Sequence, residues 1–179
     1  KYVFLANGVP AVQSKVLEQV PGRRLVVADT MDLWINIMRA DLDALLKNLD
    51  GLVLNDSEAK LLTGTENLVA AGRAVQRMGP KFVVIKKGEH GAMFFGEYET
   101  YVLPAFPTDR VVDPTGAGGM MGYLTEQDSF DADTLKTAMA YGIVAASFNV
   151  EGFGTERMQQ ITREDIEKRM GEYRKMLSF

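Results

Sequence analysis

The sequence has no cysteine and a single histidine, His90. The absence of cysteine excludes disulfides, thiolate metal sites and cysteine nucleophiles, and it fits a reducing compartment. With one histidine, the chain has no histidine-rich metal site and only one candidate member of a catalytic triad. His90 lies in a predicted turn, where a lone histidine is typical of an ordinary surface.

Positive charge and long apolar runs are also scarce. Twenty Lys and Arg residues against 24 Asp and Glu residues give a formal net charge of −4, which disfavours a general nucleic-acid-binding surface. No apolar run approaches the roughly 20 residues that a membrane-spanning helix needs, and the start lacks a basic-then-apolar signal peptide. We therefore expect a cytoplasmic protein that binds neither nucleic acid nor a membrane.

Short apolar runs alternate with segments of helical periodicity in the first half of the chain. The apolar runs predict strands over 2–6, 25–28, 51–54 and 82–86. Helices are predicted between them over 12–19, 42–48, 57–63 and 68–78. This order is typical of a parallel sheet with right-handed crossovers, flanked by helices.

The pattern changes after residue 86. We expect an antiparallel hairpin formed by 90–96 and 100–103, and then helices over 122–127, 132–147 and 163–177. No repeat or interdomain linker interrupts this order. The sequence therefore predicts one α/β domain over residues 1–179, with a mostly parallel central sheet.

A glycine-rich segment leads into the first of these later helices: Val111-Val112-Asp113-Pro114-Thr115-Gly116-Ala117-Gly118-Gly119. Its glycines would let successive amide N–H groups point at one spot, where the helix N-terminus adds about half a positive charge. Such an anion hole suits a phosphate, whereas the plain alternative is a turn that needs glycine. The segment is neither a Walker A loop nor the dinucleotide-binding fingerprint.

A second motif, Asn55-Asp56-Ser57-Glu58, directly follows the predicted strand 51–54. Polar side chains at the carboxyl edge of a parallel sheet face the crevice where such folds bind ligands. Asn55 and Glu58 could hold a hydrated Mg²⁺ through water, because magnesium dehydrates reluctantly. The alternative is structural: Asp56 or Ser57 caps a helix, and Glu58 lies in its first turn.

A third motif, Lys86-Lys87-Gly88-Glu89-His90-Gly91, begins at the last residue of the predicted strand 82–86. Its glycines would let the backbone approach a ligand closely, and Lys86 or Lys87 could meet a phosphate. The alternative is a hairpin turn with solvated lysines.

Together and in this order, the three motifs resemble the PfkB (ribokinase-like) family of carbohydrate and nucleoside kinases. The second motif matches the family's N-x-x-E sequence, and Asp113-Pro114-Thr115-Gly116-Ala117-Gly118 matches its D-P-T-G-A-G signature. Gly88 and Gly91 match the G-x-x-G step before the hairpin, and the resemblance extends to the closing Gly152-Phe153-Gly154-Thr155 loop. The implied fold is the ribokinase-like α/β fold.

The resemblance implies phosphoryl transfer from ATP to a hydroxyl of a sugar or related small molecule, with ATP and Mg²⁺ as cofactors. It assigns Asn55 and Glu58 to Mg²⁺ and its waters. The implied nucleotide-binding residues are Lys86, Gly88, Gly91 and Asn55.

The remaining implied site residues lie in the glycine-rich segment. Gly116, Ala117 and Gly118 would supply the anion hole for the transferring phosphoryl group. Asp113 and the loop at residues 152–154 resemble the region where some members hold a monovalent cation such as K⁺.

The sequence departs from the family pattern in two places. The family's catalytic base is the Asp directly after G-A-G, and here Gly119 follows, so no residue is identified as the base. We expect a short block to be missing between Gly118 and Gly119. We also expect a missing part before Lys1, because the chain opens on a predicted buried strand. Residues 1–179 then form the C-terminal part of a single kinase domain, without its substrate-binding lid.

The substrate stays open among sugars, sugar acids and nucleosides. Asp29-Thr30-Met31-Asp32-Leu33-Trp34 resembles the D-x-N-x-R-x-x-x-W stretch of some sugar kinases, but it lacks the Asn and the Arg. The alternatives are a nucleoside (adenosine-like) kinase, a catalytically inactive nucleotide-binding relative, and an unrelated nucleotide-binding α/β domain. The family's lid often forms dimer contacts, which leaves a homodimer open.

Overall fold

A computed structural model describes residues 1–109, 118–152 and 156–178 of the chain. The chain divides into two compact units. The first holds Lys1–Lys87 and Ala92–Val102, and the second holds Gly88–Gly91 and Leu103–Phe179. Each unit is considered by itself, and the single domain that the sequence predicts stays a prediction.

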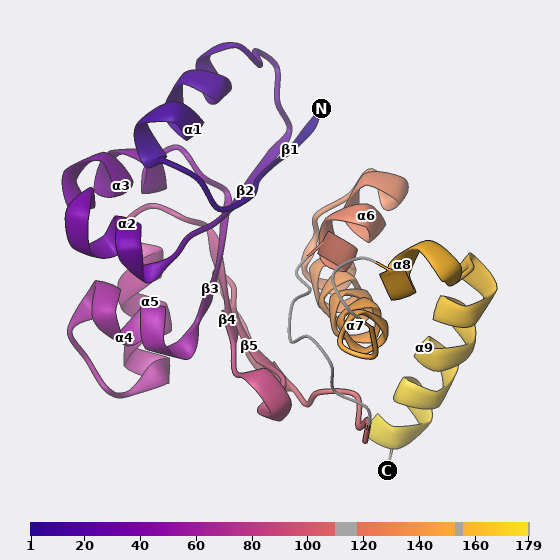
Figure 1. The fold of residues 1–179 in the computed structure, drawn as a ribbon. Helices are drawn as coiled ribbons and strands as arrows, with labels where there is room; N and C mark the ends of the chain where they lie inside the picture. Colours follow the sequence, from indigo (N-terminus) through magenta and orange to yellow (C-terminus); the bar gives the residue numbers. More distant parts are fainter. Residues whose placement is uncertain (110–117, 153–155, 179) are drawn as a thin grey trace. The chain divides into compact units, whose positions relative to one another are not determined.

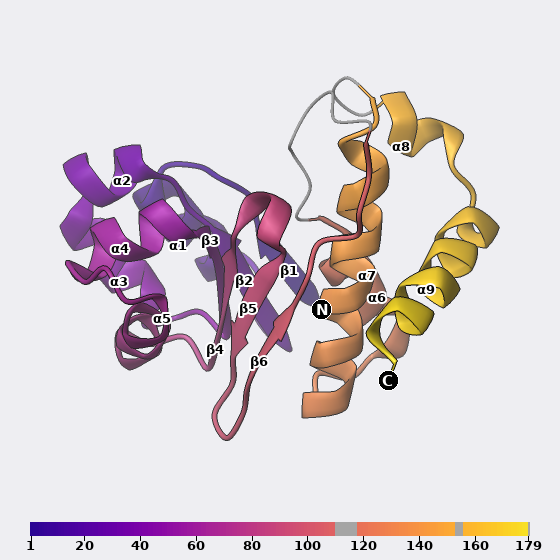
Figure 2. The ribbon, with the colours of Figure 1, turned by 90° about the horizontal axis from the view of Figure 1, so that it is seen from below.

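The first unit is built on a sheet whose strands follow one another in chain order. Its strands within the described residues are β1 (Tyr2–Leu5), β2 (Leu25–Asp29), β3 (Gly51–Asn55), β4 (Phe82–Lys86), β5 (Ala92–Phe95) and β6 (Thr100–Leu103). Strands β1 to β4 pair in parallel, and β5 is antiparallel to β4. Figure 2 shows β5 and β6 as a hairpin at one end of the sheet. The predicted mostly parallel sheet and hairpin are confirmed.

The helices of the first unit cover one face of this sheet (Figure 1). They are α1 (Pro10–Glu18), α2 (Asp32–Ile37), α3 (Arg39–Leu46), α4 (Asp56–Thr63) and α5 (Leu68–Arg77). Alternate residues of the strands, such as Leu52 and Leu54 of β3, join helix residues such as Leu42 in one buried core. Helix α2 is absent from the prediction because six residues are too few to show a helical period.

Asp50 fixes the register of the central strands at their amino ends. Its backbone N–H donates to the Val26 carbonyl oxygen at 2.9 Å, and its carboxylate accepts the Val26 N–H at 2.8 Å. Its own carbonyl oxygen accepts the Phe82 N–H at 3.0 Å. One residue thereby ties β2, β3 and β4 together, which aligns their carboxyl ends.

The second unit is helical in its described residues. It contains α6 (Gly118–Gln127), α7 (Ala132–Asn149), α8 (Glu156–Gln160) and α9 (Arg163–Leu177), and the bounds of α9 are those predicted. The Tyr123 and Tyr141 rings stack at 4.3 Å between α6 and α7, and the Tyr141 hydroxyl donates to Glu167 of α9 at 2.8 Å. Among the described helices, none combines the length and apolar character needed to span a membrane.

Two predictions in this region need correction. The first strand of the hairpin begins at Ala92 and not at His90, because Gly88–His90 forms a 3₁₀ turn. Helix α6 begins four residues before the predicted helix 122–127, and α8 was not predicted at all. The glycines of α6 and the shortness of α8 conceal both from a periodicity analysis.

Candidate functional site

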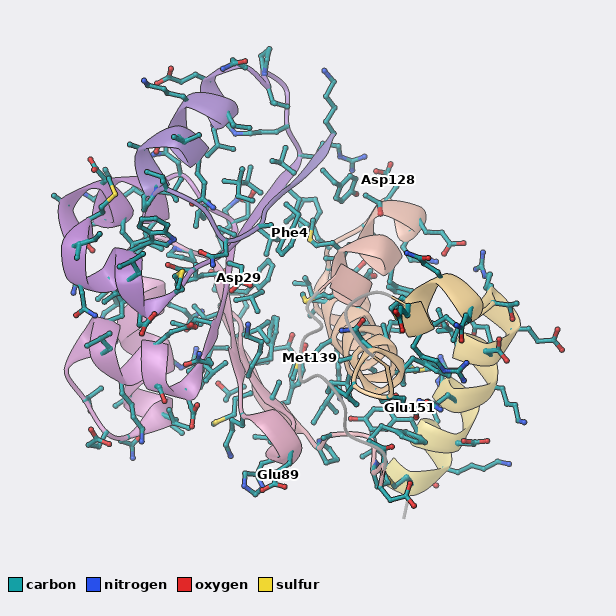
Figure 3. All side chains as sticks on the ribbon, in the orientation of Figure 1. Phe4, Asp29, Glu89, Asp128, Met139 and Glu151 are labelled. Carbon is teal, nitrogen blue, oxygen red and sulfur yellow. The ribbon has the colours of Figure 1, made fainter. Side chains whose placement is uncertain are left out.

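Polar residues end three neighbouring parallel strands of the first unit. Asp29 is the last residue of β2, Asn55 of β3 and Lys86 of β4. Asn55 lies opposite Lys86 in the register of β3 and β4, and Asp29 lies opposite Val53. Figure 3 labels Asp29 where β2 leads toward α2. The carboxyl ends of parallel strands meet at one edge, so the three side chains gather where α/β folds bind ligands.

Asn55 and Glu58 form a reciprocal pair of hydrogen bonds at the start of α4, called here the Asn55–Glu58 box. The Asn55 side-chain oxygen accepts the backbone N–H of Glu58 at 2.7 Å. One carboxylate oxygen of Glu58, Oε2, accepts the backbone N–H of Asn55 at 2.6 Å. This is a capping box, which satisfies two donors that a helix start leaves without partners. Asn55 therefore caps α4, and the cap at Asp56 or Ser57 that the structural alternative expected is wrong.

The Glu58 side chain is buried, with 8% of its surface exposed. Burial raises the pKa of its carboxyl group above the ordinary value, and the hydrogen bond from the Asn55 backbone and the positive charge of Lys86 partly oppose this rise. The carboxylate of Asp29 also raises the pKa of Glu58, because like charges disfavour each other's ionisation. The Asp29 carboxylate therefore adds to the negative charge around Glu58 at this edge.

Lys86 provides the positive charge beside this pair. Its Nζ lies 3.6 Å from Oδ1 of Asp29, across the intervening strand β3. The predicted role of Lys86 in nucleotide binding stays a prediction. Asp29 was not among the predicted site residues. Its signal was present, however, because Asp29 is the one acid at the end of the apolar run Leu25-Val26-Val27-Ala28.

The donor set at this edge fits one kind of metal ion. Within the described ranges, no group of three or more His, Cys, Asp or Glu residues is placed to hold a metal. Two carboxylates and an amide cannot form a complete protein cage. They suit Mg²⁺, which keeps several of its waters and is usually bound through one or two carboxylates together with phosphate oxygens.

Gly88 and Gly91 belong to a turn of the second unit. The Gly91 N–H donates to the Gly88 carbonyl oxygen at 3.1 Å across the 3₁₀ turn. Gly91 has a φ of +89°, and a Cβ there would collide with the Leu103 carbonyl oxygen. The positive φ and the close approach of the Leu103 carbonyl oxygen both require glycine at position 91 for structural reasons. The predicted contact of Gly88 and Gly91 with a nucleotide stays a prediction.

The predicted anion hole lies largely outside the described residues. Asp113, Gly116 and Ala117 are outside them, and so are residues 153–155 of the closing loop. Gly118 is the first residue of α6. The assignments of these residues stay predictions.

Comparison with known proteins identifies the family. The pattern of the pfkB family of carbohydrate kinases matches residues 20–162, which is more than three quarters of the chain. This chain belongs to the pfkB family. The three motifs that resemble the pfkB family all lie within the matched residues.

Two curated relatives of this pfkB-family chain are named for kinases. The bifunctional ribokinase/ribose-5-phosphate isomerase A of Fructilactobacillus sanfranciscensis is 30% identical over 145 residues, covering 70% of this chain and 27% of the relative. The cytidine kinase of Thermococcus kodakarensis is 33% identical over 113 residues, covering 61% of this chain and 40% of the relative. The chain thus spans less than half the length of either.

A solved structure shares the fold. Aminoimidazole riboside kinase from Salmonella enterica, solved with aminoimidazole riboside and an ATP analogue, matches with a TM-score of 0.77 and 15% identity. The match covers 94% of this chain and 62% of that one. At this identity the likeness establishes the ribokinase-like fold, which confirms the predicted fold class.

Gly119 follows Gly118 directly, where the family resemblance predicts a catalytic Asp or a missing block. The described residues show that α6 and α7 approach each other closely there. A Cβ at Gly119 would lie 2.5 Å from the Ala145 Cβ and 3.1 Å from the Tyr141 carbonyl oxygen. This close approach explains a glycine at position 119 and leaves no room for a carboxylate side chain.

Proposed function

We propose that the protein transfers the terminal phosphoryl group of ATP to a hydroxyl group of a sugar or related small molecule. Membership of the pfkB family supports this activity, as do relatives named for ribokinase and cytidine kinase. The observation that carries the proposal is the Asn55–Glu58 box at the carboxyl edge of the parallel sheet, beside Asp29 and Lys86.

Phosphoryl transfer depends on positioning and charge neutralisation more than on covalent chemistry. Asp29, Asn55 and Glu58 would hold Mg²⁺ through its waters, and Mg²⁺ when bound would neutralise charge on the phosphates of ATP. Lys86 adds a cation on the same edge. The burial of Glu58 strengthens its electrostatic interactions, because a site with little water screens charge weakly.

Other residues have roles that only the family resemblance predicts. Gly116, Ala117 and Gly118 would supply the anion hole, and Gly88 and Gly91 would lie along the nucleotide. A monovalent cation near Asp113, a homodimer and a cytoplasmic location stay predictions.

A catalytically inactive nucleotide-binding relative is the second candidate. The observation that favours it is Gly119, because glycine cannot take a proton from a substrate hydroxyl. The close packing at Gly119 also means that a simple substitution would not restore a base. We expect Gly119→Asp to destabilise the protein by about 2 kcal/mol through overpacking, without creating activity. A gain of activity in this variant would contradict that view.

The deciding experiment measures binding and turnover on the complete protein. Binding of Mg-ATP is measured by isothermal titration calorimetry, and ADP release is measured with ribose, deoxyribose, fructose and cytidine as acceptors. Turnover with a sugar supports the proposal, whereas turnover with cytidine alone indicates a nucleoside kinase. Binding without turnover identifies an inactive relative. The absence of Mg-ATP binding would overturn both candidates.

A further inference from the structure

Arg169 of α9 lies between two phenylalanine rings of the second unit. Its guanidinium carbon is 3.5 Å from the centre of the Phe148 ring and 5.1 Å from the centre of the Phe106 ring. Only 16% of the Arg169 side chain is exposed, so water is largely excluded from both contacts. A planar guanidinium stacks on aromatic faces in this way, and the attraction is stronger where water is excluded.

The same guanidinium also contacts the end of α7. Its Nη1 lies 2.9 Å from Oε1 of Glu151, whose side chain is 14% exposed, and it donates to the Ser147 hydroxyl at 3.0 Å. Oε2 of Glu151 lies 3.7 Å from Nε of Arg157 in α8. Glu151, which Figure 3 labels, lies two residues beyond the last residue of α7. A carboxylate this enclosed depends on its cationic partners, because an unpaired buried charge is costly.

These contacts join two segments that lie far apart in the sequence. Phe106 belongs to the segment that follows β6 and leads to the glycine-rich residues 111–119, to which the family resemblance assigns the anion hole. Glu151 directly precedes the closing loop at 152–154. Arg169 therefore contacts the chain shortly before each of the two loops.

Tyr173 holds the first of these segments one turn further along α9. Its hydroxyl donates to the Pro104 carbonyl oxygen at 2.6 Å, and its ring lies 6.4 Å from the Phe106 ring. The Tyr173 side chain is fully buried. Residues four apart lie on the same face of a helix, so one face of α9 fixes the segment after β6 at two points.

We propose that Arg169 is a positioning residue for phosphoryl transfer, which ties the segment before the glycine-rich residues to the segment before the closing loop. Arg169 acts through Phe106 and Glu151 and does not itself meet the ligand. This inference rests on the proposed function, because that function gives the two loops a common nucleotide to hold.

The chemistry of the side chain allows the two links to be separated. Lysine keeps the positive charge that pairs with Glu151, but it has no planar face to stack on Phe106. Methionine keeps a long apolar stem and removes both the charge and the N–H donors. Arg169→Lys therefore weakens one link, whereas Arg169→Met breaks both.

The test measures Mg-ATP affinity by calorimetry and the unfolding midpoint in urea, both on the complete protein. We expect Arg169→Met to weaken Mg-ATP binding by about tenfold, as changes at residues without ligand contact can do. Where an acceptor is turned over, kcat should fall by about 100-fold with a smaller change in KM, because the anion hole acts on the transferring phosphoryl group. Arg169→Lys should lie between Arg169→Met and wild type.

A double-mutant cycle tests the link between the two segments. Phe106→Leu and Glu151→Gln each weaken one contact of Arg169. Their combined loss of Mg-ATP affinity should be smaller than the product of the two single losses, because either change already breaks the link. In Arg169→Met, neither change should weaken binding by more than about twofold further.

Arg163→Met is the matched control on the same helix. Arg163 pairs with Glu126 at 2.6 Å, but its side chain is 72% exposed. An exposed pair contributes little, so this variant should keep wild-type affinity, kcat and unfolding midpoint.

Several outcomes would overturn the inference. A lower unfolding midpoint in Arg169→Met with wild-type affinity and kcat would show that the arginine only stabilises the second unit. Fully independent losses in the cycle would show that Arg169 does not link the segments. If Arg169→Met does not fold, Arg169→Lys and the cycle in the wild-type background decide the matter. Failure of wild type to bind Mg-ATP would reject the proposed function, and this inference with it.

Discussion

The Asn55–Glu58 box and the capping box of α9 are the same local structure in two different environments. In α9, the Thr162 hydroxyl accepts the Asp165 N–H at 3.2 Å, and the Asp165 carboxylate accepts the Thr162 N–H at 2.8 Å. Asp165 is exposed, and its carboxylate also accepts the Thr162 hydroxyl at 2.8 Å; the hydrogen bonds from the Thr162 backbone N–H and hydroxyl lower the pKa of the Asp165 carboxyl group. Glu58 receives the equivalent bond, yet burial raises its pKa.

The difference shows that a motif's hydrogen bonds do not by themselves determine the chemistry of its carboxylate. Hydrogen bonds to an ionised carboxylate favour ionisation, and at exposed Asp165 they outweigh the opposing effect of desolvation. At the edge of the sheet, burial and, to a lesser degree, the neighbouring charge of Asp29 outweigh the backbone hydrogen bond from Asn55 and the positive charge of Lys86. A helix begins at both places, but the acid is buried only in the Asn55–Glu58 box.

The largest expected effect is a loss of activity that follows a charge-removing change in the Asn55–Glu58 box but not the matched change in the capping box of α9. Glu58→Gln keeps the capping box, because glutamine at this position can also accept the backbone N–H, but it removes the charge. We expect kcat of the complete protein to fall by about 100-fold. Asp165→Asn, the matched change in the exposed box, should leave kcat unchanged. Steady-state kinetics over a range of Mg²⁺ concentrations checks both, and equal losses in the two variants would contradict the comparison.

A smaller effect concerns the lysine beside each box. Lys86→Met removes the charge that favours ionised Glu58 and leaves two carboxylates together, so we expect about 1 kcal/mol lower unfolding free energy at pH 8. The pKa of Glu58 should rise further, and the loss should therefore shrink as the pH falls through that pKa. Lys168→Met, near Asp165, should show no measurable change in urea unfolding. A pH-independent loss in Lys86→Met would contradict this account.

Removal of the exposed cap should cost less still. Thr162→Ala deletes the oxygen that accepts the Asp165 N–H, and we expect about half a kcal/mol lower unfolding free energy. Thr162→Ser retains the oxygen and should match wild type. Urea unfolding with circular dichroism measures both variants. A loss in Thr162→Ser as large as in Thr162→Ala would show that the Thr162 methyl group, and not the cap, is responsible.

The smallest expected effect is a difference of sign in the pH dependence of stability. The folded-state pKa of Glu58 is raised, so its contribution is greatest below the unfolded value and is lost as the pH rises through the folded value. The folded-state pKa of Asp165 is lowered, so its contribution is present above the unfolded value and is lost as the pH falls through the folded value.

Two charge-removing variants test this difference. The stability of wild type relative to Glu58→Gln should decrease as the pH rises from acid toward neutral. The stability of wild type relative to Asp165→Asn should increase over the same direction of change. Urea unfolding at a series of pH values measures both, and slopes of the same sign would reject the comparison.

Much of the fold could be predicted from the sequence because its signals are local. The apolar runs predicted β1 to β4 to within one residue at each end, and the helical period predicted the bounds of α9. Elements without a strong period escaped prediction, among them the six-residue helix α2 and the glycine-rich start of α6. The site was predicted where a motif marks it, at Asn55 and Glu58. Asp29 was not predicted as a site residue, because its partner Lys86 lies 57 positions further along the chain.

The sequence by itself determined the order of strands and helices and the family resemblance. Those properties depend on residues a few positions apart, whose period and side-chain chemistry are visible in the chain. Only the tertiary structure decided which acid is buried, that Asp29 and Lys86 share the edge with Glu58, and that α7 leaves no room at Gly119. Burial and distance between remote segments follow from packing, which sets the local dielectric and thereby raises the pKa of Glu58.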